Sequence, residues 1–229
     1  MIIADNLRDV RRRIESAKER KSTDQAVQVV AVTKTHPFAV IRECYKAGIV
    51  SIGENRIQEA SEKFQNFSGF PRITKRFIGH LQTNKVKKCL DLFDTIDSVD
   101  SIKLARKISN LAESLGKTLP VLLEVNTTKE KQKHGFLSDQ LEEMISCVAF
   151  PGINVRGLMT IGPVTRKKNE TRRSFIILRE VKERLNDKLK KKKVTELSMG
   201  MSNDFEIAIE EGSTMIRLGT VLLGPRCKL

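Results

Sequence analysis

The chain has 229 residues, of which 39% are hydrophobic and 31% are charged. This length and apolar content suffice to bury one sizeable core, so we expect a single domain over residues 1–229. The sequence holds no apolar run long enough to cross a bilayer and no basic-then-apolar leader after Met1. These absences predict a soluble, cytoplasmic protein without a membrane partner.

The cysteine pattern argues against a protein stabilised by disulfides and against one stabilised by a bound metal. Cys44, Cys89, Cys147 and Cys227 are scattered, without a C-x-x-C pair and without a histidine at metal-ligand spacing. We therefore expect reduced, buried thiols, with neither a disulfide framework nor a metal site.

The net charge of +14 is the feature that favours a different class, because basic domains bind nucleic-acid backbones. The densest basic patches, at 11–13 and 188–193, lie beside segments whose other faces are apolar. No aromatic residues are interleaved for base stacking, so solvated helix faces explain these patches better. A nucleic-acid-binding module remains an alternative that rests on charge alone, and we expect no specific nucleic-acid partner.

The order of predicted elements begins with an amphipathic helix, which places Ile3, Leu7, Val10 and Ile14 on one stripe. Apolar and β-branched runs typical of strands follow at 28–34, 50–54, 77–81, 92–96, 120–126, 155–161, 195–199 and 215–223. Segments of helical period separate many of them, at 57–67, 104–115, 141–148 and 175–189.

This alternation predicts a parallel sheet covered by helices, because the strands are apolar on both faces. Eight such units close naturally into a (β/α)8 TIM-type barrel, with a doubly wound open sheet as the alternative. After the last strand, residues 225–229 are too few for an eighth outer helix. The extra N-terminal helix can take that place.

Lys34 is the first candidate functional residue. The first apolar strand ends abruptly in this lysine, and reactive groups of such barrels lie at the carboxyl ends of strands. An ammonium that loses hydration there favours its neutral form, which condenses with aldehydes. A lysine at a strand end is more often solvated or ion-paired, so Lys34 alone leaves both interpretations open.

A candidate anion site lies near the carboxyl terminus, at 198–203 and 217–220. Glycines let the backbone approach an anion, and free amides and hydroxyl groups can donate hydrogen bonds to it. Alternatively, Ser202 and Asn203 cap a helix and Gly219 relieves crowding. A lysine and an anion cradle at the same mouth together suggest an aldehyde that carries a phosphate.

Several motifs then occur in a fixed order along nearly the whole chain. They are AVTKT at 31–35, IGENR at 52–56, FIGHLQTNK at 77–85, GLMTI at 157–161, LSMGMSN at 197–203 and IRLGT at 216–220. In this combination the chain resembles the pyridoxal phosphate homeostasis protein family.

The resemblance implies a cofactor, pyridoxal 5′-phosphate, held as an internal aldimine on Lys34. It also implies that Arg217 faces the pyridine nitrogen, where a guanidinium disfavours protonation and weakens the ring as an electron sink. The remaining implied cofactor-binding residues are Asn55, Met159, Ser198, Met199, Gly200, Ser202, Gly219 and Thr220.

By the same resemblance we expect a monomeric, non-catalytic carrier that stores, buffers or delivers pyridoxal phosphate, with PLP-dependent apoenzymes as partners. The chain is also similar to the N-terminal domain of alanine racemases, so a racemase-like enzyme is the main alternative. That reaction needs a second domain and a tyrosine base, whereas Tyr45 lies in the first helix after Lys34. A lysine aldolase would need an acid-base partner near Lys34, and the sequence does not identify one. His36, His80 and His134 fit caps or loops better than bases.

Overall fold

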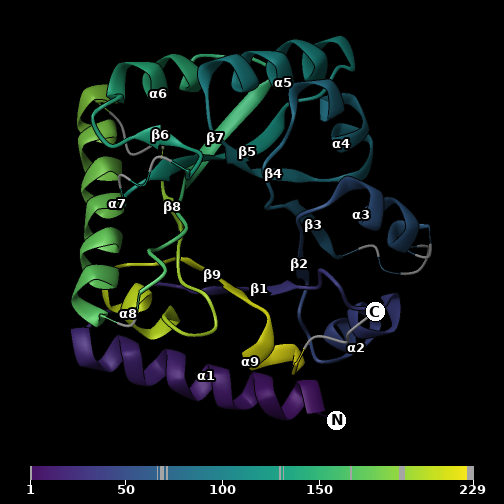
Figure 1. The fold of residues 1–229 in the computed structure, drawn as a ribbon, viewed down its shortest axis with the longest axis vertical. Helices are drawn as coiled ribbons and strands as arrows, with labels where there is room; N and C mark the ends of the chain where they lie inside the picture. The colour runs from purple at the N-terminus through teal and green to yellow at the C-terminus, as the bar shows by residue number, and fades with distance from the viewer. Residues whose placement is uncertain are drawn as a thin grey trace.

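The computed structural model describes residues 2–65, 67, 70, 72–128, 130, 132–165, 167–190 and 194–225. Figure 1 shows a central ring of strands surrounded by helices. The strands are β1 Gln28–Val32, β2 Ser51–Glu54, β3 Thr74–Phe77, β4 Thr95–Val99, β5 Leu119–Asn126, β6 Phe136–Leu137, β7 Ile153–Met159, β8 Glu196–Ser198 and β9 Met215–Leu218. The α-helices are α1 Ile2–Lys21, α2 Phe38–Lys46, α3 Ile57–Phe64, α4 Val86–Leu92, α5 Ile102–Ser114, α6 Leu141–Val148, α7 Lys168–Leu189, α8 Phe205–Glu210 and α9 Thr220–Leu223, and the short 3-10 helix η1 covers Thr83–Lys85.

The sheet closes on itself. Its strands follow the order β4-β3-β2-β1-β9-β8-β7-β5, all neighbours are parallel, and β4 also pairs with β5. The two-residue strand β6 adds to the end of β5. The predicted (β/α)8 TIM-type barrel is therefore confirmed, and the open doubly wound sheet is wrong.

The N-terminal helix α1 packs across α8 and α9 on the outside of the barrel. Leu7, Val10, Ile14 and Ala17 form its buried stripe, as the helical period predicts. The last predicted strand, 215–223, is too long, because β9 ends at Leu218 and α9 follows after Gly219. The apolar residues of α9 pack on α1 instead of extending the sheet.

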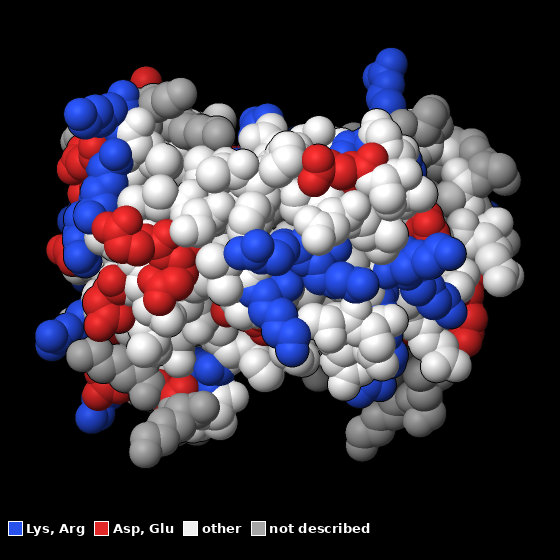
Figure 2. Space-filling view, turned by 90° about the horizontal axis from the view of Figure 1, so that it is seen from above, with Lys and Arg blue, Asp and Glu red and all other residues white. Residues whose placement is uncertain are grey.

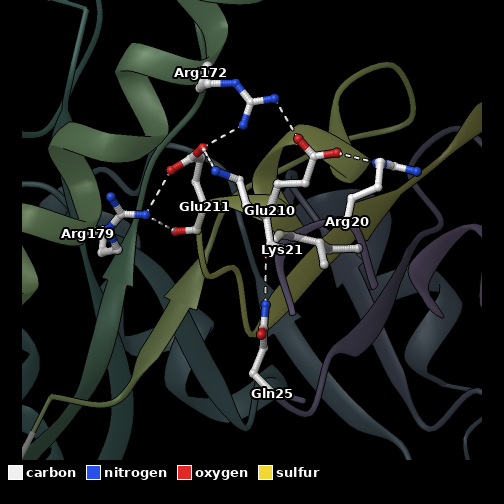
Figure 3. A network of polar contacts seen from close by, with 8 residues as sticks. Arg20, Lys21, Gln25, Arg172, Arg179, Glu210 and Glu211 are labelled. Carbon is white, nitrogen blue, oxygen red and sulfur yellow. Dashed lines mark hydrogen bonds and ion pairs between the residues drawn. The ribbon is translucent and has the colours of Figure 1, made fainter. Parts of the chain in front are cut away.

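An ion-pair network fastens these outer helices together (Figure 3). Arg172 of α7 contacts Glu210 and Glu211 at the end of α8, each at 2.5 Å. Arg179 of α7 reaches Glu211 at 2.8 Å, and Arg20 of α1 reaches Glu210 at 2.7 Å. Because Glu211 is only 3% exposed, these contacts lie where ion pairs are weakly screened.

The third and fourth strands lie a few residues from the predicted positions of 77–81 and 92–96. Both strands carry buried charges that the apolar pattern does not reveal. Arg76 of β3 pairs with Asp97 of β4 at 3.1 Å and donates to Ser51 of β2 at 2.9 Å. These side chains fill the barrel interior near the amino ends of its strands.

Above this polar layer, Val30, Leu122, Met159 and Met215 form a separate apolar cluster drawn from β1, β5, β7 and β9. Side chains two positions apart on a strand point to the same face. The next inward residues after Leu122 and Met215 are therefore Glu124 and Arg217, at the carboxyl end of the barrel.

Much of the positive charge lies on helix surfaces. Arg11 and Arg12 are exposed on α1, Arg12 pairs with Asp9, and Arg13 lies 4.5 Å above the ring of Phe205. Figure 2 shows a band of Lys and Arg side chains on the face that carries α4 and α5. In the second predicted patch, Lys188 pairs with Glu142, whereas 191–193 lie outside the described residues.

Cys44, Cys89 and Cys147 are unpaired and buried, and burial raises the pKa of the Cys44 thiol to about 12. The predicted burial is confirmed for these three thiols, their reduced state stays a prediction, and Cys227 lies outside the described residues. Within the described ranges, the helices include none with both the length and the apolar character that a membrane span requires.

Candidate functional site

Lys34 lies two residues beyond the end of β1, the strand whose Val30 belongs to the interior apolar cluster. It is partly buried. The next residue, Thr35, has a φ of 64°, which is uncommon for a β-branched residue and requires support from its surroundings.

That support comes from a buried ionic cluster of Glu54, Glu59 and Lys63. The Thr33 hydroxyl donates to Glu54 Oε1 at 2.6 Å, and the Thr35 amide donates to Glu59 Oε1 at 2.5 Å. Lys63 Nζ donates to Glu54, to Glu59 and to the Thr33 carbonyl, at 2.8, 2.6 and 2.7 Å. The residues on both sides of Lys34 are therefore tethered, which fixes the backbone from which its side chain extends.

Glu54 is fully buried, and burial raises the pKa of its carboxyl group despite opposing hydrogen bonds from Lys63 and Thr33. Among the described side chains, its Oε2 is the one buried polar atom without a hydrogen-bond partner. Sequence reasoning missed this cluster. The available signals were the buried glutamate of IGENR and the i,i+4 pair of Glu59 and Lys63.

Arg217 of β9 is buried inside the barrel, and its orientation is fixed. One terminal nitrogen donates to the carbonyl and the hydroxyl of Ser198, both at 2.7 Å, and the other donates to the Thr160 carbonyl at 2.8 Å. Burial lowers the pKa of Arg217, and nearby carboxylates including Glu124 oppose that effect. The Ser198 hydroxyl therefore faces Arg217 and is fully buried.

Glu124 of β5 is the second titratable group in this region. Burial raises the pKa of Glu124 to about 7, the charge of Asp100 adds to the rise, and Arg217 opposes it. A carboxyl group that titrates near neutral pH is suited to proton transfer. Sequence reasoning missed Glu124, although a glutamate within the apolar run 119–126 was a usable signal.

The loops after β8 and β9 form the candidate anion cradle. Gly200 has a φ of 95°, and a Cβ there would lie 2.6 Å from Ala208 Cβ and 2.9 Å from Phe205 Cα. Only glycine fits this close approach. The Ser202 hydroxyl accepts from the amides of Gly219 and Val221 at 3.3 and 3.4 Å. These long hydrogen bonds leave two amides and one hydroxyl available to a stronger acceptor.

The other expected residues lie around the same opening. Asn55 is partly buried directly after β2, Met159 belongs to the interior apolar cluster, and Thr220 is exposed at the start of α9. Met199 is fully buried in the core, so it offers only its backbone. The expected site residues lie at the carboxyl ends of β2, β1, β9, β8 and β7, which are consecutive neighbours in the barrel. Their roles as cofactor ligands stay predictions.

Comparison with known proteins identifies the family of the chain. The family model of the alanine racemase N-terminal domain matches residues 5–227. The pyridoxal phosphate homeostasis protein of Aquifex aeolicus is 38% identical over 228 residues, covering 99% of each chain. The protein of the same name from Mus musculus is 36% identical over 237 residues, covering 96% of this chain and 85% of its own.

Solved structures show the same fold. PipY of Synechococcus elongatus, determined with PLP bound, superimposes with a TM-score of 0.86 at 36% identity, covering 97% of this chain and 100% of PipY. An alanine racemase of Clostridium difficile gives a TM-score of 0.76 at 20% identity, covering 95% of this chain and 59% of the racemase, a likeness of fold alone. The chain belongs to the pyridoxal phosphate homeostasis protein family, within the larger family of alanine racemase N-terminal domains.

Proposed function

We propose that this protein binds pyridoxal phosphate and acts in its intracellular homeostasis, by storing, buffering or delivering the cofactor. The observation that carries the proposal is the convergence of three groups at one barrel mouth. They are the tethered Lys34, the buried guanidinium of Arg217, and the cradle of Ser202 with the Gly219 and Val221 amides. Relatives named for pyridoxal phosphate homeostasis, and PipY with PLP bound, support it.

The described residues fit the cofactor. Pyridoxal phosphate supplies an aldehyde that condenses reversibly with a primary amine, and we assign that amine to Lys34. Ser202, Gly200, Gly219 and Thr220 would hold the phosphate, with Met199 contributing its backbone. Arg217 would face the ring nitrogen, and Asn55 and Met159 would flank the ring. Ser198 was expected at the phosphate, and its hydrogen bonds to Arg217 support a positioning role instead.

We infer a carrier without catalytic turnover, because a charged guanidinium at the ring nitrogen disfavours carbanion chemistry. Tyr45 packs edge-on against Phe70 with ring centroids 5.1 Å apart, so it serves as a packing residue in the outer layer. We also propose that the barrel is a single-domain, cytoplasmic monomer that hands the cofactor to PLP-dependent apoenzymes. The second candidate function is racemase-like or aldolase activity. The carboxyl group of Glu124 favours it, because it supplies a titratable group in the barrel interior.

The test is an absorbance spectrum with added pyridoxal phosphate, followed by borohydride reduction and peptide mapping. We expect a visible band and a stable adduct on Lys34. Lys34→Ala should lose both, whereas Lys46→Ala, which removes an exposed lysine of α2, should keep both. An adduct that persists in Lys34→Ala would refute the assignment. Turnover of alanine that depends on Glu124 would favour the enzyme.

A further inference from the structure

Three side chains that the proposed function does not use converge on the opposite part of the rim. His80 follows β3, Asp100 follows β4 directly, and His134 precedes β6. Asp100 Oδ2 lies 3.0 Å from His80 Nδ1 and 3.9 Å from His134 Nδ1. The two imidazole rings stack with centroids 3.8 Å apart and planes at 11°. One ligand atom from each of the three residues lies within 4.8 Å of the others.

This donor set matches a known class of metal site. Imidazole nitrogens together with a carboxylate oxygen suit zinc and neighbouring divalent transition metals better than Mg²⁺ or Ca²⁺. Tetrahedral zinc with bonds of about 2.0–2.1 Å requires ligand atoms roughly 3.3 Å apart. The distances of 3.0 and 3.9 Å bracket that spacing. A metal ion lies in the plane of each imidazole that binds it, so at least one of the two stacked rings must rotate on binding. The histidine side chains are 44% and 55% exposed, which leaves room for that rotation.

The surrounding residues hold the ligands in the way that supporting shells of metal sites do. The Ser101 hydroxyl donates to Asp100 Oδ1 at 3.0 Å, which leaves Oδ2 directed at the histidines. The Ser98 hydroxyl of β4 donates to the Gly79 carbonyl at 2.5 Å and fixes the backbone beside His80. Gly135 has a φ of 115°, and a Cβ there would lie 2.8 Å from Asn126 N, so glycine brings His134 close to β5.

We propose that His80, Asp100 and His134 bind a divalent transition-metal ion of the zinc class. Three protein ligands leave a fourth coordination position to water or to an incoming ligand. Sequence analysis predicted no metal site, because these three ligands come from separate loops and lack short-range spacing. Parallel pairing of β3, β4 and β5 brings those loops together.

The proposal is tested by titrating Zn²⁺ against a chromophoric chelator, with pyridoxal phosphate removed and again with it bound. We expect one Zn²⁺ per chain. His80→Ala, His134→Ala and Asp100→Asn should each weaken binding at least tenfold, and Ser101→Ala should weaken it less. The matched controls are His36→Gln, which removes the remaining histidine, and Asp91→Asn on α4. Both should bind Zn²⁺ as the wild type does.

The double variant His80→Ala/His134→Ala gives the decisive comparison, because both side chains are exposed and their loss should leave the fold intact. Circular dichroism checks that fold. Loss of Zn²⁺ binding in a folded double variant supports the site, whereas unchanged stoichiometry and affinity overturn it. A visible band with pyridoxal phosphate in the same variant shows that the cofactor site is independent, so the two proposals fail separately.

Discussion

The titration of Glu124 predicts a specific dependence of stability on pH. The pKa of Glu124 rises from its usual 4.5 to about 7, mainly because the carboxyl group is buried. The folded state therefore favours the neutral acid. This contribution to stability is complete below about pH 4.5 and is lost as the pH rises through about 7.

The magnitude follows from the two pKa values. One pKa unit corresponds to about 1.4 kcal/mol, so the full effect is on the order of 3 kcal/mol. Between pH 5 and pH 8, linkage gives a loss of about 2.5 kcal/mol from this residue. Glu124→Gln keeps a neutral side chain of similar size and removes the titration. The stability of this variant, measured relative to the wild type, should therefore rise by about 2.5 kcal/mol between pH 5 and pH 8.

The assay is urea denaturation followed by circular dichroism at pH 5, 6, 7 and 8 without cofactor. Glu113→Gln, which changes an exposed glutamate of α5, is the matched control and should follow the wild-type pH dependence. If Glu124→Gln and the wild type lose stability in parallel, to within about 0.5 kcal/mol, Glu124 does not enter the fold as a neutral acid and the reasoning fails.

Four further predictions concern the supports of the site and the surface charge. Lys63→Met should lower the free energy of unfolding by about 3–5 kcal/mol, because it leaves the buried carboxylate of Glu54 and the partly buried carboxylate of Glu59 without their cation. Lys46→Met, at an exposed ion pair, should change it by less than about 0.5 kcal/mol in the same denaturation assay. Glu211→Ala should lower the free energy of unfolding by about 3 kcal/mol, because Arg172 and Arg179 lose their buried partner. Asp9→Ala, which removes an exposed ion pair of α1, should change the free energy of unfolding little. Equal effects of the two substitutions would contradict a role for burial. Gly200→Ala should remove cofactor binding, measured by the visible band, because its Cβ collides with α8, and full binding would show that the loop yields. Binding to duplex DNA, followed by fluorescence anisotropy, should be weak, sequence-blind and lost at physiological salt; tight binding there would revive the nucleic-acid alternative.

Local patterning was sufficient to predict most of the fold. Apolar runs separated by helical periods indicated the barrel, and the abrupt end of the first run placed Lys34 at its mouth. The errors in the predicted strands β3, β4 and β9 have a common cause, which is contact with residues far away in the sequence. Arg76 and Asp97 pair across neighbouring strands, so the residues that interrupt the apolar pattern are buried in the barrel. The tail of the last run turns into α9 because α1, far away in sequence, provides a surface for it.

In the candidate site, too, local sequence patterns predicted some residues, and tertiary contacts determine the others. Lys34, Gly200 and Arg217 stand out in the sequence because each breaks a local pattern at a strand end. The groups that hold or tune them come from other elements. Glu59 and Lys63 of α3 support the turn after β1, and Glu124 of β5 interacts electrostatically with Arg217 of β9. Strand register decides such contacts, and no short window of sequence contains both partners.

Glu124 links the two halves of the barrel mouth. One half, at the ends of β7, β8, β9, β1 and β2, carries the proposed cofactor residues, and the other, at β3, β4 and β6, carries His80, Asp100 and His134. The charge of Asp100 raises the pKa of Glu124 and that of Arg217 lowers it, so its protonation responds to both sides. Pyridoxal phosphate is an anion, and negative charge bound at the same barrel mouth would favour the neutral form of Glu124. The pKa of Glu124 should therefore be higher when pyridoxal phosphate is bound. The shift is measured by comparing the pH dependence of stability of the wild type and of Glu124→Gln, with and without the cofactor. An identical pH dependence in both states would show that the cofactor does not act on Glu124 through this charge.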